Sequence, residues 1–294
     1  MARTCLCACL ILAVIVAGCS DDRRRVTVGS KNFLEQMLLS ELIAQLLEHR
    51  LKVRVDRRFN LGGTMIAHRA LLNGDIDLYP EYTGTALTAV LDLPPSVDAA
   101  AVRDRVKREY QRRYGLEWLD PLGFENTFAM IVRKADAERD QLESLSDASR
   151  RALAWTLGVG YEFQQRPDGL PRLLETYPLT LTGPPATMDL GLLYQALQQR
   201  QVDMIAGNST DGPLAVLDVT MLRDDRQCFP PYEAAIIVRP DALNRIPGLR
   251  AALDELTGRL SEPTMRRLNQ QAVTRRGQVA EVAKEFLATS GVGR

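Results

Sequence analysis

Short strand-like stretches alternate with helix-like stretches from residue 25 onward, and this alternation limits the folds open to the chain. Residues 25–29 alternate polar and apolar side chains as a strand does, and residues 52–59 repeat that pattern. Between them, leucines recur at every fourth position over residues 34–46, which predicts a helix with its apolar stripe on one face. Residues 64–72 indicate a second helix and residues 76–82 a third strand. Such alternation is typical of βαβ units in a parallel sheet.

A break follows at Leu93-Pro94-Pro95, and the strand predicted over residues 127–133 leads into a new region. A charged helix is predicted over residues 97–114, and the end of the chain is predicted to be mostly helical over residues 247–287. Short strands are predicted over residues 127–133, 155–160, 179–182, 202–206 and 234–238.

Part of the sequence pattern repeats at an offset of 126 residues. Asp77 followed by Tyr82-Thr83 corresponds to Asp203 followed by Asn208-Ser209, although so short a match also arises by chance. We therefore expect an α/β protein with two lobes of similar plan that face each other across a cleft. Small-molecule sites occur preferentially in clefts of this kind.

The first residues resemble a bacterial secretion signal. An uncharged run over residues 4–16 is shorter than the roughly 20 residues that a membrane-spanning helix needs. Val16-Ala17-Gly18-Cys19 then resembles a lipobox, with small residues before the cysteine as a cleavage site requires. We expect a signal peptide over residues 1–18 and a tether over residues 19–25 that begins at a lipidated Cys19. An uncleaved anchor is the alternative.

Cysteine and charge counts exclude several kinds of protein. Of the five cysteines, three lie in the predicted signal peptide and Cys19 is predicted to carry lipid, so Cys228 has no partner for an intrachain disulfide. Lys+Arg and Asp+Glu balance at 37 each, so the charge indicates no nucleic-acid partner. The two histidines, His49 and His68, form no cluster with metal-ligand spacing, and we expect neither a metal nor a cofactor.

One strand-to-helix corner, residues 28–36, carries groups that suit an anion. Asn32 is a predicted helix N-cap, with Glu35 three residues later as in a capping box. Free N–H groups at a helix N-terminus and the adjacent Lys31 attract anions. The alternative is that Lys31 lies on a solvated loop.

Four stretches together resemble the substrate-binding proteins of ABC importers for glycine betaine, choline, carnitine and similar osmoprotectants. They are, in chain order, Gly29-Ser30-Lys31-Asn32-Phe33, Asp77-Leu78-Tyr79-Pro80-Glu81-Tyr82-Thr83-Gly84-Thr85, Ser209-Thr210-Asp211-Gly212, and Asp224-Asp225-Arg226 leading to Pro230-Pro231-Tyr232. The resemblance implies a two-lobed periplasmic-binding-protein fold of the second type, each lobe a mostly parallel sheet flanked by helices. The first lobe would comprise residues 26–126 and 233–294, and the second lobe residues 127–232.

The resemblance also implies which residues bind the cationic group of the ligand. A trimethylammonium group cannot donate a hydrogen bond, so aromatic rings form a box around it. Two walls of the box correspond to Tyr82 and Tyr232, and a third corresponds to Phe128, which keeps the ring without the hydroxyl. The fourth wall corresponds to Asn208, where the chain replaces a tyrosine by an amide. Asn126, just before the third wall, belongs to the expected ligand-binding set.

For the anionic end of the ligand, the resemblance implies Lys31, Thr85 and Arg166. Two cations and a hydroxyl suit a carboxylate, and we expect Lys31 and Arg166 to hold it from opposite lobes. Without the resemblance, Tyr82 and Tyr232 would be ordinary half-buried tyrosines, and Arg166 a surface arginine paired with a nearby aspartate.

The predicted function is binding and delivery, because no nucleophile, base and orienting group recur at a spacing that suggests an enzyme. We expect a solute-binding protein, lipid-anchored in the periplasm or on the outer face of the cell membrane. It would deliver a small zwitterionic or cationic ligand to an ABC permease with its ATPase. One alternative is a ligand-sensing or interaction module with the same fold. Another is a binder of a different polar zwitterion, such as an amino-acid derivative that hydrogen-bonds Asn208.

Overall fold

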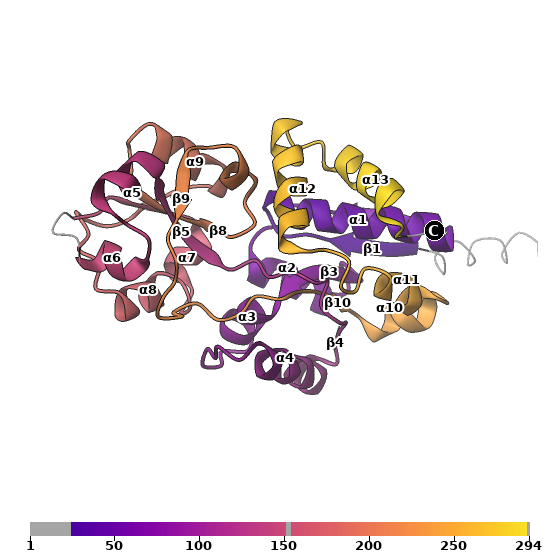
Figure 1. The fold of residues 1–294 in the computed structure, drawn as a ribbon. Coiled ribbons are helices and arrows are strands. Elements are labelled where there is room, and N and C mark those ends of the chain that lie inside the picture. The colour runs from indigo at the N-terminus through magenta and orange to yellow at the C-terminus, as the bar shows by residue number, and fades with distance from the viewer. Residues whose placement is uncertain (1–24, 151–153, 293–294) are drawn as a thin grey trace, which may run out of the picture.

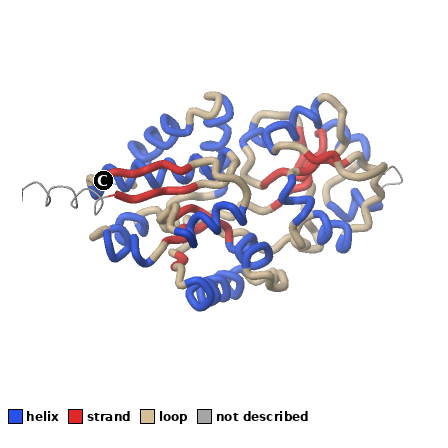
Figure 2. Tube along the Cα trace, turned by 180° about the vertical axis from the view of Figure 1, so that it is seen from behind, coloured by secondary structure: helices blue, strands red, loops and turns tan. Residues whose placement is uncertain are grey.

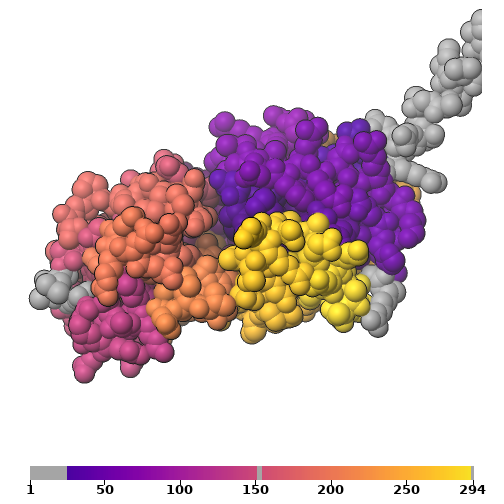
Figure 3. Space-filling model, turned by 90° about the horizontal axis from the view of Figure 1, so that it is seen from above, coloured from indigo at the N-terminus to yellow at the C-terminus, as the bar shows by residue number. Residues whose placement is uncertain are grey.

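The computed structural model describes residues 25–150 and 154–292, which form two lobes joined side by side (Figure 1). The predicted signal peptide, Cys19 and nearly all of the tether lie outside the described residues. Each lobe contains a five-stranded mixed sheet flanked by helices (Figure 2). In Figure 3 the beginning of the chain (purple) and its end (yellow) share the first lobe, and the middle of the chain (magenta to orange) builds the second. This arrangement is a two-lobed α/β fold, as predicted.

The sheet of the first lobe has the strand order β2-β1-β3-β10-β4. Its strands are β1 (Arg25–Gly29), β2 (Arg54–Arg58), β3 (Leu78–Tyr82), β4 (Glu117–Trp118) and β10 (Ala234–Val238). Strand β1 runs parallel to β2 and β3, and β10 runs antiparallel between β3 and β4. Strands β3 and β10 are buried along their whole length because they lie inside the sheet with helices on both faces.

Helices cover both faces of the first sheet. They are α1 (Leu34–Leu51), α2 (Thr64–Asn73), α3 (Thr83–Thr85) with the π-helical turn Ala86–Val90, α4 (Ala99–Tyr114), α10 (Pro240–Arg245), α11 (Leu249–Asp254), α12 (Glu262–Thr274) and α13 (Val279–Ser290). Helix α1 packs with α11, α12 and α13 on one face, while α2 and α4 pack on the other.

Two predictions about α1 need correction. The single apolar stripe is too narrow, because Leu39 and Ile43 are also buried where α11 and α13 cover the outer side of the helix. The predicted cap at Asn32 is also wrong. The helix begins after Phe33, which makes no side-chain cap hydrogen bond, and Glu35 is instead engaged by side chains from other elements.

The sheet of the second lobe has the order β7-β6-β8-β5-β9. Its strands are β5 (Phe128–Arg133), β6 (Leu157–Val159), β7 (Ala186–Thr187), β8 (Met204–Asn208) and β9 (Val219–Met221). Its helices are α5 (Lys134–Asp140), α6 (Leu145–Arg150), α7 (Tyr161–Gln165), α8 (Leu170–Thr176) and α9 (Leu190–Gln198), with a 3-10 turn at Gly212–Ala215. The strand predicted over residues 179–182 is wrong, because only Leu181 forms an isolated bridge, and the edge strand is the two-residue β7.

The two sheets repeat the same plan at the predicted offset of 126 residues. Strand β8 begins 126 residues after β3, and α9 begins 126 residues after α2. The aspartates just before these two strands also make equivalent contacts. Asp77 accepts a hydrogen bond from the backbone N–H of Thr27 and pairs with Arg245, while Asp203 accepts from the N–H of Thr156 and pairs with an arginine at the end of β5.

Two segments join the lobes, residues 119–127 between β4 and β5 and residues 222–233 between β9 and β10. They pair with each other through a bridge between Glu125 and Glu233. A third contact lies apart from them, where the turn after β8 rests on α12. There the Arg266 guanidinium and the Asn269 amide donate to the carbonyls of Ser209 and Thr210. None of the described helices is long and apolar enough to cross a membrane.

Candidate ligand-binding cleft

A cavity of about 720 Å³ is lined by residues of both lobes. All eight residues of the predicted ligand-binding set line it: Lys31, Tyr82, Thr85, Asn126, Phe128, Arg166, Asn208 and Tyr232. The structure therefore brings together residues that lie as far apart in the chain as 31 and 232. The cavity is also lined by residues that the sequence did not point to, among them Phe33, Glu35, Glu162, Phe163, Tyr194, Asp211 and Asn269.

Aromatic rings form two groups on the cavity wall. The Phe128 ring meets Phe163 edge-on, with ring centroids 4.9 Å apart, and meets Tyr232 at 5.6 Å. Tyr82 stacks with Phe33 at 6.3 Å. Tyr232 can approach the end of β3 because residue 84 is glycine, where a Cβ atom would lie 2.7 Å from the Tyr232 ring. The aromatic rings of the predicted set therefore line the cavity, and Phe33 and Phe163 add to them.

Lys31 is buried at the corner after β1. Its Nζ atom lies 2.5 Å from Glu81 Oε1 and 5.0 Å from the centroid of the Tyr82 ring. Both partners of the ion pair are almost fully buried, so the alternative that Lys31 lies on a solvated loop is wrong. The positive charge of Lys31 is thus already matched by a carboxylate within the first lobe.

Arg166 follows α7 and is paired in the second lobe. Its Nε and Nη2 atoms donate to the carboxylate of Asp168 at 3.0 and 2.6 Å. The guanidinium carbon lies 4.9 Å from the centroid of the Phe128 ring. Burial raises the pKa of Asp168, but the Arg166 charge and hydrogen bonds from Arg166, Tyr232 and Thr88 outweigh it and hold the pKa below its usual value. The pairing with Asp168 is therefore present, but in a buried site and not on the surface.

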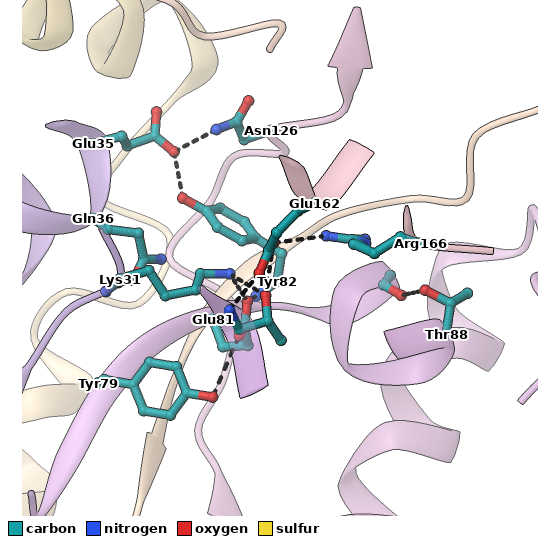
Figure 4. Close-up of polar contacts among 12 residues, drawn as sticks. Lys31, Glu35, Gln36, Tyr79, Glu81, Tyr82, Thr88, Asn126, Glu162 and Arg166 are labelled. Atoms are coloured by element: carbon teal, nitrogen blue, oxygen red, sulfur yellow. Dashed lines mark hydrogen bonds and ion pairs between the residues drawn. The ribbon is translucent and has the colours of Figure 1, made fainter. Parts of the chain in front are cut away.

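Glu162 of α7 lies between these two cations, as Figure 4 shows. Its carboxylate accepts from the backbone N–H of Thr64 at 2.5 Å and from the Thr64 hydroxyl at 3.0 Å, at the N-terminus of α2. Its Oε2 atom lies 3.7 Å from Arg166 Nη1. Burial raises the pKa of Glu162, but the charges of Lys31 and Arg166 and the Thr64 hydrogen bonds lower it below its usual value overall.

Glu35 is a buried carboxylate that the sequence pattern did not assign to the site. Four side chains donate to it at 2.5 to 2.8 Å, namely Tyr82, Asn126, Thr210 and Asn269. Two of these, Tyr82 and Asn126, belong to the predicted ligand-binding set. Burial raises the pKa of Glu35 against the lowering effect of the four hydrogen bonds. Glu35 thus fixes the orientation of side chains that face the cavity.

At the predicted fourth wall, Asn208 lies directly opposite Phe128 in the pairing of β5 with β8. Its side-chain amide donates to Asp211 at 3.4 Å, and its backbone N–H donates to Asp211 at 2.9 Å. The Tyr194 hydroxyl donates to the same carboxylate. Burial raises the pKa of Asp211 above its usual value. An amide and a carboxylate therefore occupy the end of β8, where the pattern of the resembled family has a tyrosine ring.

The described residues contain no group of three or more His, Cys, Asp or Glu side chains placed to hold a metal ion. Two lobes around a cavity lined by aromatic rings and buried charges define a receptor for a small molecule. The comparisons with known proteins place it in a family. Residues 24–289 match the family model OpuAC, described as the substrate binding domain of ABC-type glycine betaine transport systems, and the chain belongs to this family. The family consists of solute-binding receptors, so the protein is not an enzyme.

The chain is similar to relatives along nearly its whole length. It is 32% identical over 274 residues to the carnitine transport binding protein OpuCC of Listeria monocytogenes, covering 92% of this chain and 88% of that protein. It is 34% identical over 289 residues to a glycine-betaine-binding protein of Pseudomonas aeruginosa, covering 95% and 92%. Among solved structures, a glycine betaine/carnitine/choline ABC transporter protein gives a TM-score of 0.77 at 32% identity, covering 92% of this chain and 100% of that one. The type II periplasmic-binding-protein fold is thereby confirmed.

Proposed function

We propose that this protein is a lipid-anchored, extracytoplasmic solute-binding protein that delivers a quaternary-ammonium or betaine-like osmoprotectant to an ABC permease. The observation that carries the proposal is the convergence of all eight predicted residues on one cavity between the lobes. The relatives named for carnitine and glycine betaine support the same class of ligand. We further propose residues 26–126 with 233–294, and residues 127–232, as the two units that move relative to each other when ligand binds.

The aromatic rings are proposed to hold the ligand's cationic group. Tyr82, Phe128 and Tyr232 line the cavity, and each cation–π contact in a dry site contributes up to about 2 kcal/mol. Lys31, Thr85 and Arg166 form the polar end of the proposed site, and the amides of Asn126 and Asn208 complete its wall.

A thermal-shift screen tests this proposal. Glycine betaine, carnitine and choline are compared with amino acids that lack a quaternary nitrogen. A ligand at 100 times its Kd raises the free energy of unfolding by about 2.7 kcal/mol, so binders separate clearly from non-binders. Stabilisation by at least one quaternary compound is expected. Stabilisation by amino acids alone would favour the alternative ligand class, and capture of a signalling partner without any permease would favour the sensing alternative.

The proposed anchor has its own test. The Cys19→Ala variant should lose membrane attachment or accumulate as an unprocessed precursor, because the thiol of Cys19 is the proposed site of the lipid. Membrane fractionation and intact-mass measurement report both outcomes. Cys228→Ala serves as the control, since Cys228 is buried inside the described fold. Normal processing and membrane retention of Cys19→Ala would contradict the anchor.

A further inference from the structure

The charges around the cavity do not suit a ligand that brings its own carboxylate. Among the described residues that line the cavity, the cations are Lys31 and Arg166, and the carboxylates are Glu35, Glu162, Asp189 and Asp211. Each cation also has a buried carboxylate behind it, Glu81 for Lys31 and Asp168 for Arg166. Burial raises the pKa of Glu35 and Asp211, whereas the charges and hydrogen bonds around Glu162 lower its pKa. The Glu162 charge therefore lies beside two cations that are already paired, which favours a ligand with a net positive charge.

Glu162 stands in the place where the carboxylate of a zwitterion would be expected to bind. The resemblance assigns the ligand's anionic end to Lys31 and Arg166, and the Glu162 carboxylate lies between these two side chains (Figure 4). It also accepts two hydrogen bonds from Thr64, at the positive end of the ten-residue helix α2. The Thr64 hydroxyl in turn lies 3.5 Å from Lys31 Nζ. The donors that would receive an incoming carboxylate are thus already occupied.

Glu162 packs closely against the residue before Thr64. Residue 63 is glycine, and a Cβ atom there would lie 2.4 Å from Glu162 Oε1. Glu162 belongs to the second lobe and Thr64 to the first, so these hydrogen bonds also join the two lobes across the cavity. A ligand carboxylate would have to displace Glu162 from them, or lie against it and meet like-charge repulsion. A cation without a carboxylate leaves Glu162 in place and gains from its charge.

We propose that Glu162 sets the specificity of the cleft, so that it selects a trimethylammonium cation with no carboxylate, such as choline, over a zwitterion such as glycine betaine. This inference rests on the proposed function and narrows its ligand class. The aromatic rings accept the trimethylammonium group of either compound, and Glu162 provides the discrimination at the other end.

Calorimetric titration with choline chloride and with glycine betaine tests the proposal. The wild-type protein should bind choline at least tenfold more tightly than glycine betaine. In Glu162→Gln, which keeps the shape and removes the charge, the ratio of the two affinities should move toward betaine by at least tenfold. Using the ratio cancels any general effect of the variant on lobe closure, because both ligands are measured on the same protein.

Two further variants separate charge at Glu162 from other effects. Glu143→Gln removes an exposed carboxylate of the second lobe that does not line the cavity, and it should leave the ratio within about twofold. Glu162→Asp keeps the carboxylate and should keep the preference for choline. This variant also provides a test if Glu162→Gln does not fold. Tighter binding of betaine than of choline by the wild type, or an unchanged ratio in folded Glu162→Gln, would overturn the proposal while leaving the proposed function intact. Binding of neither compound to folded wild-type protein would overturn both.

Discussion

The two lobes share one scaffold but end their third parallel strands differently. In the first lobe β3 ends at Tyr82, and the chain turns at once into helix α3, so that an aromatic ring lines the cavity. In the second lobe β8 ends at Asn208, and the chain turns onto α12. The supporting aspartates, Asp77 and Asp203, bind equivalent backbone groups in both lobes. The comparison teaches that the shared aspartates and strands maintain the sheet in both lobes. The last residue of each strand, Tyr82 or Asn208, determines which chemical group lines the cavity.

The lobes are alike in a second respect, because each holds a buried ion pair beside the cavity. We expect Lys31→Met and Arg166→Met each to lower the free energy of unfolding by about 3–5 kcal/mol, since each leaves an unpaired buried carboxylate, Glu81 or Asp168. Urea unfolding measures both. Lys134→Met, which removes an exposed pair with Glu138, is the control and should change stability by less than about 1 kcal/mol. A large loss in one lobe only would show that the two pairs are not equivalent.

The lobes should differ in their response to pH, because both histidines lie in the first lobe. The ring nitrogens of His68 have no hydrogen-bond partner among the described residues, and the ring packs against Tyr110 and Tyr114 at 5.5 and 4.8 Å. Burial lowers the pKa of His68 to about 4. The unfolded chain therefore binds this proton at a higher pH than the folded protein does. Stability from this group is complete above about pH 6.5 and is lost as the pH falls toward 4.

We expect His68→Phe to remove a pH-dependent loss of about 2 kcal/mol over that range. Urea unfolding at several pH values gives the difference between the variant and the wild type, which isolates His68 from the carboxylates that titrate in the same range. The exposed His49 provides the control as His49→Phe. Parallel pH curves for wild type and His68→Phe would mean that His68 does not contribute.

The smallest expected effect concerns the difference between the lobes itself. Asn208→Tyr gives the second lobe the residue that the first lobe has at Tyr82, and it should tighten binding of a trimethylammonium ligand by about 0.5–2 kcal/mol. Calorimetric titration measures the change, and Asn208→Leu is the control that adds apolar bulk without a ring. If both variants bind equally well, the gain comes from apolar contact. If folded Asn208→Tyr binds no better than the wild type, the missing ring does not limit the affinity.

The strand and helix plan of both lobes could be predicted because it depends on patterns among residues that are close in sequence. The strand-helix alternation and the repeat at 126 residues predicted the plan of both sheets. The predicted ligand-binding residues all line one cavity. The failures have a physical cause. Strand β7 has only two residues, too few for a periodic pattern. Glu162 and Glu35 acquire their roles from partners such as Thr64 and Asn269, distant in sequence, and no spacing rule connects such pairs.

The contact between the turn after β8 and helix α12 has a consequence for affinity. Any motion that separates the second lobe from α12 must break the bonds from Arg266 and Asn269 to the carbonyls of Ser209 and Thr210. A Cβ atom added at Gly212 would lie 2.6 Å from the backbone nitrogen of Gln270, so the turn after β8 and helix α12 are in close contact there. If the open form gives up this contact, its strength enters the observed dissociation constant just as a direct ligand contact does. Natural variation along the C-terminal helices could then adjust the concentration at which the receptor fills, while the residues that recognise the ligand stay unchanged.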